Sequence, residues 1–241
     1  MEPSYRSAGR AAIMSGLIGL IAHGFLWAFV LRRVSGGDEQ STVPLIRAHD
    51  AGVILQSLFM IPVVFTIHGI VRRHTRGTSR GTVGIGVAAL SLIILSLLLV
   101  FANVLADDIY TVPQGWFGIW LIVISWRVSS VFPRSLTWFG TVIGIGLVLV
   151  ATFPFGYRIF VDPTFGPVSY NSEPPAGTER ANEIVHNIFI IGSFMGVTTL
   201  PLWSALMGRR LLKMGRLATA GATSQGVVNQ QHAANDAARR S

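Results

Sequence analysis

Cysteine is absent from this chain of 241 residues, and charged side chains are scarce. Without cysteine the protein has no disulfide, no thiolate metal site and no thiol nucleophile. Charged residues make up 12% of the sequence, about half of the roughly 25% found in soluble domains. Hydrophobic residues account for 51% and fall in runs of about 17–25, the length that crosses a bilayer core. The composition therefore predicts an integral membrane protein in contact with the lipid bilayer.

Charge is also missing from the middle of every apolar run, which disfavours an ion-coupled carrier. The formal net charge of +8 would suit a nucleic-acid partner. The arginines, however, flank the apolar runs, where membrane topology alone explains them. We therefore predict no nucleic-acid partner.

The apolar runs predict an all-α bundle of six transmembrane helices forming one domain over residues 11–207. We expect the helices at about residues 11–31, 51–71, 82–106, 115–131, 136–155 and 184–207. Residues 1–10 are a polar leader, and residues 157–183 form an extracytoplasmic loop rich in proline. Residues 208–241 are a basic, then low-complexity tail, for which we expect partial disorder.

Six spans place both termini on the same side of the membrane. On that side the leader, two connections and the tail carry 14 Arg and Lys residues, against 5 on the other side. Because short cytoplasmic segments carry an excess of positive charge, both termini are predicted to be cytoplasmic. The expected location is the inner membrane of a bacterial cell.

Residues 116–150 read WFGIWLIVISWRVSSVFPRSLTWFGTVIGIGLVLV. A Gly-x-Trp helix, an arginine and a Phe-Pro-Arg-x-Leu-x-Trp-x-Gly start of the next helix resemble uncharacterised bacterial six-helix membrane proteins, grouped as domains of unknown function. The resemblance implies a leader helix, four further helices and a terminal helix. It implies no activity, cofactor or binding residue.

Strongly polar residues at membrane depth are costly, and each becomes a candidate site residue. They gather in the outer half of the predicted bundle. His49 and Gln56 are seven residues apart and therefore share one face of the second helix. The expected polar cluster, close in depth to His23, is His49, Gln56, Asn103, His186 and Asn187.

Two interpretations of the outer carboxylates and histidines stay open. His49, Asp107 or Asp108, and His186, with Asp50 as a further candidate, could hold a zinc ion that hydrolyses a lipid-like substrate at the outer leaflet. Alternatively, the His49-Asp50 pair caps the helix that follows, and Asp107 and Asp108 end the preceding span. No His-Glu-x-x-His or comparable spacing occurs, so the sequence requires no metal.

A further alternative function concerns His23, because it is the histidine that lies well inside its predicted span. Paired with a histidine such as His186 it could bind a haem, and alone it could ligate a chlorophyll-type pigment. A hydrogen bond from His23 to Gln56 or Asn103 would satisfy it without any cofactor.

Small residues spaced four apart, as in Gly140/Gly144 and Gly192/Gly196, predict close helix contacts. The favoured function is that of a non-enzymatic accessory or ligand-binding subunit, which packs against other membrane protein subunits through these helices. The alternatives are a haem- or pigment-bearing subunit of a bioenergetic complex and a metal-dependent hydrolase of the outer leaflet.

Overall fold

The computed structural model of the chain describes residues 5–36, 38–74, 80–106, 108–163 and 174–218. Its elements are α1 (Tyr5–Val34), α2 (Glu39–His74), α3 (Arg80–Phe101), α4 (Thr111–Arg127), α5 (Arg134–Ala151), α6 (Phe153–Phe160), α7 (Glu179–Gly192) and the π-helical turn η1 (Ser193–Val197). A last helix over residues 200–218, called the C-terminal helix here, follows η1. The predicted all-α class is confirmed for these residues.

Five helical stretches in the described chain are long and apolar enough to cross a membrane. They are Tyr5–Val34, Gln40–His74, Gly81–Phe101, Arg134–Phe160 and Glu179–Ala218. The protein is therefore an integral, multi-pass membrane protein. The remaining helix, α4, has 17 residues and a length of about 25 Å, just short of a bilayer core of about 30 Å.

The predicted connection over residues 32–50 is wrong, because α1 runs to Val34 and α2 already begins at Glu39. His49 and Asp50 therefore lie inside α2 and do not cap its start. Hydropathy marks only the part of a helix that lies in lipid. The backbone hydrogen bonds of α2 begin earlier, in the more polar residues that precede its apolar run.

Other predicted bounds shift as well, most of them because helices continue past their apolar runs. Residues 5–10 of the predicted leader belong to α1, and residues 208–218 of the predicted tail belong to the C-terminal helix. The third helix ends at Phe101, while α6 extends the fifth span into the predicted loop as far as Phe160. Residues 1–4, 164–173 and 219–241 lie outside the described part.

The predicted glycine contacts are present, but they lie inside this chain. A Cβ atom added to Gly140 would lie 2.4 Å from the Ser125 hydroxyl of α4. One added to Gly192 would lie 2.8 Å from the Gly146 carbonyl, and one added to Gly196 would lie 2.5 Å from the Leu147 nitrogen. These glycines let α5 pack against α4 and against the last span, so they offer no surface to another subunit.

The last span changes direction and partner at η1. Within it the Thr198 amide donates to the Ser193 carbonyl, and Pro201, which has no N–H, follows one turn later. Before this point α7 packs on α5 and α6; after it the C-terminal helix packs on α1, where Gly16 lies against Pro201. The π-helical turn η1 and Pro201 thus mark the point from which the last span packs beside α1.

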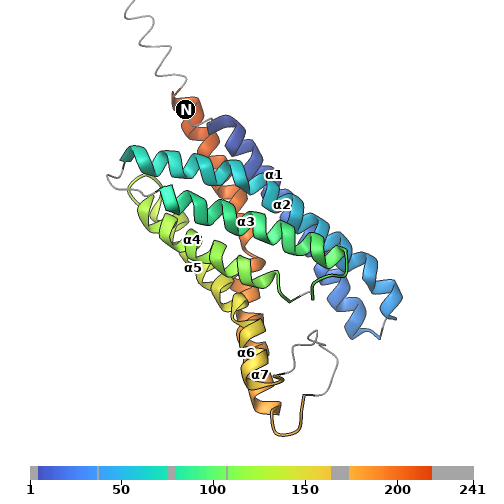
Figure 1. Cartoon of the computed structure of the whole chain (residues 1–241). Coiled ribbons are helices and arrows are strands. Elements are labelled where there is room, and N and C mark those ends of the chain that lie inside the picture. The colour runs from blue at the N-terminus through green and yellow to red at the C-terminus, as the bar shows by residue number, and fades with distance from the viewer. Residues whose placement is uncertain (1–4, 37, 75–79, 107, 164–173, 219–241) are drawn as a thin grey trace, which may run out of the picture.

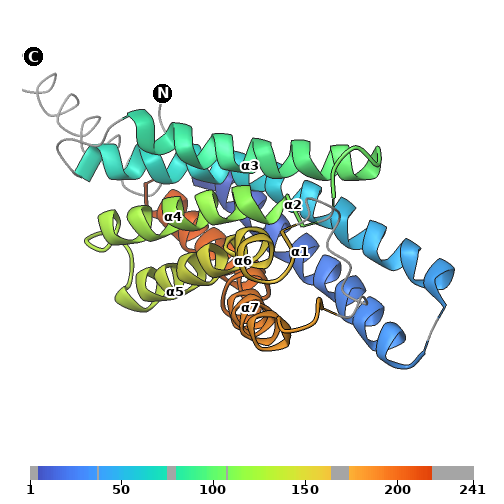
Figure 2. The ribbon, with the colours of Figure 1, turned by 60° about the horizontal axis from the view of Figure 1, so that its bottom comes forward.

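The bundle is closed at one end and forked at the other. In Figure 1 the α1–α2 hairpin and the α6–α7 pair diverge at the end away from the N-terminus, and Figure 2 shows the same two arms after rotation. The three largest fully buried side chains, Trp120, Trp203 and Phe117, come from α4 and the C-terminal helix and lie in the main core. The fork separates the polar residues of α2 from those of α7.

Candidate functional site

The imidazole rings of His23 in α1 and His49 in α2 meet inside the α1–α2 hairpin. Their centroids are 5.7 Å apart, and the ring planes lie at 88° to each other. The two residues are only 5% and 2% exposed. Two histidines thus occupy a buried position in a span where each polar group needs a partner.

One nitrogen of each ring is fixed by the backbone of α1. His23 Nδ1 lies 2.7 Å from the Gly19 carbonyl oxygen, and His49 Nδ1 lies 3.1 Å from the Ala22 carbonyl oxygen. A carbonyl oxygen only accepts hydrogen bonds, so each Nδ1 carries a proton, and in the neutral tautomer with that proton Nε2 carries none. Each Nε2 then keeps a lone pair available to a ligand.

Two polar atoms, one of His23 itself and one of the nearby Gln56, are buried without a hydrogen-bond partner in the described part of the chain. Among the described residues, neither His23 Nε2 nor Gln56 Nε2 has a hydrogen-bond partner. Gln56 is 5% exposed, and its side-chain amide lies against Gly19, while its backbone carbonyl accepts from the Ser15 hydroxyl at 3.1 Å. A buried unpaired group costs about 1–3 kcal/mol, so the arrangement favours occupation by a polar ligand.

Small residues bring the site together. A Cβ atom added to Gly52 of α2 would lie 2.6 Å from the Cβ atom of Ala22 in α1. One added to Gly19 would lie 2.7 Å both from the Gln56 amide oxygen and from Pro201 Cγ. Residues of α1, α2 and, at Pro201, the C-terminal helix therefore pack closely against one another here.

Asn103 has a different role from the predicted one. It follows α3 with a left-handed φ of 55°, as helix-ending residues often do. Arg47 of α2 donates to the Asn103 side chain and to the Val100 carbonyl, both at 3.2 Å. Arg47 also lies over the Phe101 ring, 4.9 Å from its centroid. Asn103 and Arg47 thus fix the end of α3 to α2.

His186 and Asn187 lie on the other arm of the fork. His186 Nδ1 bonds the Asn182 carbonyl at 2.9 Å, and its ring packs against Phe153 and Tyr157 of α6, with centroids 5.4 and 6.1 Å away. Asn187 is exposed. Of the predicted cluster, His49 and Gln56 lie along the α1 segment that carries His23, two helical turns apart on α2. His49 contacts the His23 ring, and the Gln56 amide lies against Gly19, whose carbonyl is bonded to His23 Nδ1.

The predicted zinc ligands do not gather. Asp108 is buried and pairs with Arg158 of α6 at 2.8 Å, and Asp107 lies outside the described residues. Across the part of the chain that the structure describes, no three His, Asp or Glu side chains group around a possible ion. The Asp108–Arg158 pair instead ties the segment before α4 to α6.

A haem does not fit the histidines present. His186, the predicted partner of His23, lies on the other arm, and His49 takes its place beside His23. A macrocycle between two axial histidines needs an open slot between their helices. The contact of Gly52 with Ala22, next to both histidines, closes that slot.

A Gly-x-Ser-x-Gly pattern occurs at residues 77–81. In α/β-hydrolases such a serine sits on a sharp turn between a strand and a helix. Here the pattern follows α2, which ends at His74, and its last two residues are the first two of α3, which begins at Arg80. Ser79 itself lies outside the described residues, and the helical flanks do not supply the nucleophile turn.

The two fixed imidazoles and the unpaired amide define the α1–α2 site, which consists of His23, His49 and Gln56. Sequence periodicity predicts the His49–Gln56 stripe, but not the contact between His49 and His23. Comparison of the chain with protein-family models, with curated proteins and with solved structures finds no match in any of the three.

Proposed function

We propose that this protein is a non-enzymatic, multi-pass membrane protein that binds a small polar ligand at the α1–α2 site. The observation that carries the proposal is the pair of unpaired, buried atoms, His23 Nε2 and Gln56 Nε2. His23 Nε2 offers a lone pair and Gln56 Nε2 offers an N–H, so a polar ligand at the site satisfies a group that the described part of the protein leaves unpaired.

The binding role is favoured over the accessory-subunit role. The glycines that were to pack against other subunits are used within the chain, between α5, α4 and the last span. Two polar atoms of the α1–α2 site, His23 Nε2 and Gln56 Nε2, in contrast have no hydrogen-bond partner among the described residues. Helices that need only to associate would bring such groups into direct contact.

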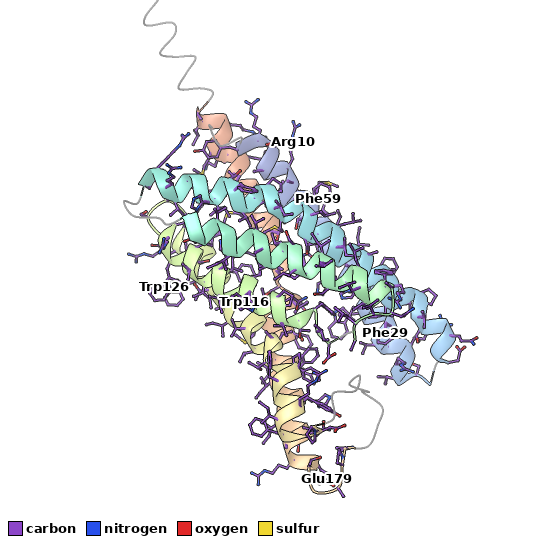
Figure 3. All side chains as sticks on the ribbon, in the orientation of Figure 1. Arg10, Phe29, Phe59, Trp116, Trp126 and Glu179 are labelled. Atoms are coloured by element: carbon purple, nitrogen blue, oxygen red, sulfur yellow. The ribbon has the colours of Figure 1, made fainter. Side chains whose placement is uncertain are left out.

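We further propose that the protein crosses a cell membrane six times, with α4 added to the five long spans, and that both termini lie in the cytoplasm. The resemblance of residues 116–150 to six-helix membrane proteins belongs to this proposal. Arg10 and Glu179 lie at opposite ends of the molecule (Figure 3), and the arginine-rich connections favour the Arg10 end as the cytoplasmic one.

The absence of cysteine makes the topology directly testable, because each introduced cysteine is the only one. Cysteines at Ala102 and Ser35 should react with an impermeant maleimide added outside intact cells. Cysteines at Ser130 and Leu217 should react only after the cells are opened. Labelling of Ser130→Cys in intact cells would contradict the crossing of α4.

The ligand itself is tested by native mass spectrometry of the full chain, released from its own membrane in mild detergent. We expect an adduct of defined mass on the wild-type protein. The double variant His23→Leu/Gln56→Leu should lose it, and His186→Leu, on the other arm, should keep it. An adduct-free wild-type spectrum, or equal occupancy in all three proteins, would contradict the proposal.

A further inference from the structure

The two histidines of the α1–α2 site are held in the way that metal-binding histidines are held. A metal-ligating imidazole almost always donates its second nitrogen to a carbonyl or carboxylate, which fixes the ring and leaves the other nitrogen for the ion. Both His23 and His49 meet this condition through the Gly19 and Ala22 carbonyls. His23 Nε2 is, in addition, buried and unpaired within the described chain.

The spacing of the rings also fits a shared ion. A metal–nitrogen bond is about 2.0 Å, and the nitrogen lies about 1.2 Å from the ring centre. Two imidazoles on one ion therefore have centroids about 5.2 Å apart at a ligand angle of 110°, and about 6.4 Å apart at 180°. The observed separation of 5.7 Å lies within this range.

The anchoring keeps both Nε2 nitrogens off the carbonyls that hold the rings. Gly19 and Ala22 are three residues apart, so their carbonyls lie on one face of α1. Because Nδ1 and Nε2 lie on different edges of an imidazole, fixing both Nδ1 atoms to that face turns both Nε2 atoms away from it. The Gln56 amide oxygen of α2 lies against Gly19, the residue whose carbonyl is bonded to His23 Nδ1.

The donor set favours a monovalent ion. Two neutral imidazoles and one amide carry no charge, so the whole charge of the ion is buried in the span. The energy of burying an ion grows with the square of its charge, so a divalent ion costs about four times as much as a monovalent one. Asp50 follows His49 directly and therefore points about 100° away around α2. Among the metals that imidazole suits, copper has a stable monovalent state.

We infer that the α1–α2 site binds Cu(I) through His23 Nε2 and His49 Nε2, with the Gln56 amide oxygen as the third donor. This inference rests on the proposed ligand-binding function and names its ligand class. Imidazole binding of Cu(I) needs no change of oxidation state and no proton release from neutral rings that are already protonated at Nδ1.

The test is an anaerobic titration of the detergent-purified full chain with Cu(I) against a coloured Cu(I) chelator. We expect one tightly bound ion per wild-type chain, and an affinity at least about tenfold lower in His23→Ala and in His49→Ala. His68→Ala is the matched control, because His68 also lies on α2 and has a buried, unpaired Nδ1 among the described residues. Equal copper binding by the wild type and the double variant His23→Ala/His49→Ala would overturn the inference.

X-ray absorption of the copper-loaded wild type gives an answer that does not depend on any variant folding. Two imidazole nitrogens should appear at about 2.0 Å from copper. Sulfur neighbours, or a preference for Zn²⁺ over Cu(I) in the same titration, would overturn it. A non-metal adduct that depends on His23 and Gln56 would reject copper but keep the proposed function, whereas the absence of any adduct would reject both.

Discussion

The contact between Gly52 and Ala22 offers the sharpest test of how the α1–α2 site is built. In Gly52→Ala the new Cβ atom would lie 2.6 Å from the Cβ atom of Ala22, whereas carbon atoms in contact lie about 3.5–4.0 Å apart. Relief of the clash separates the helices by about 1 Å. The His49–Ala22 hydrogen bond, now 3.1 Å, would then lengthen to about 4 Å, beyond hydrogen-bonding distance.

The energy follows from these changes. Overpacking costs about 1–3 kcal/mol, and a lost interhelical hydrogen bond in a membrane costs about 0.6 kcal/mol. Alanine recovers up to about 1 kcal/mol through its higher helix propensity. With the full helix-propensity gain, we therefore expect Gly52→Ala to lower the free energy of unfolding by about 0.6–2.6 kcal/mol and to reduce ligand occupancy at the same time.

Gly24→Ala is the matched control, because a Cβ atom at Gly24 meets nothing within 4 Å. This variant should be neutral or up to about 1 kcal/mol more stable. Both variants can be measured by reversible SDS-induced unfolding in mixed micelles, followed by tryptophan fluorescence. Equal stability of Gly52→Ala and Gly24→Ala would refute the close helix contact on which the site depends.

Two further predictions concern the polar side-chain contacts that join separate segments of the bundle. Asp108→Asn removes the charge paired with Arg158, so amide exchange in α6 should become faster, by the equivalent of about 1–3 kcal/mol; unchanged exchange by mass spectrometry would contradict this contact. Arg47→Lys loses the planar guanidinium that bonds to Val100 and Asn103. The free energy of opening of the last turn of α3 should therefore fall by about 1 kcal/mol, and its amide exchange should become faster. A Lys variant as well protected as the wild type would show that charge alone suffices.

Much of the fold follows from hydropathy, because a span of lipid demands an unbroken apolar helix. The runs predict the crossing helices well, but they mark the depth of lipid and not the length of the helix. For this reason α2 begins at Glu39, well before its apolar run, and His49 becomes an interior residue. A helix cap was predicted there because the sequence gives no sign that the polar stretch is helical.

The site was predicted only in part, for reasons of geometry. Spacing along α2 places His49 and Gln56 on one face, and depth places His23 at their level. Neither the spacing nor the depth shows which arm of the fork a helix joins. The predicted cluster therefore includes His186, although α7, which carries it, diverges from α1 and α2. The contact of His23 with His49 depends on the close approach of Gly52 to Ala22, which concerns two helices at once.

The central claim is that His23 and His49 present two free Nε2 atoms to a ligand, and ¹⁵N NMR of histidine-labelled protein tests it most directly. Variants at each position assign the signals, and Cu(I), being diamagnetic, leaves them visible. We predict that both rings are neutral with the proton on Nδ1, and that both Nε2 signals shift together when Cu(I) is added, while His186 stays unchanged. A proton on Nε2 of either ring, or a titration that leaves both signals in place, would contradict the account.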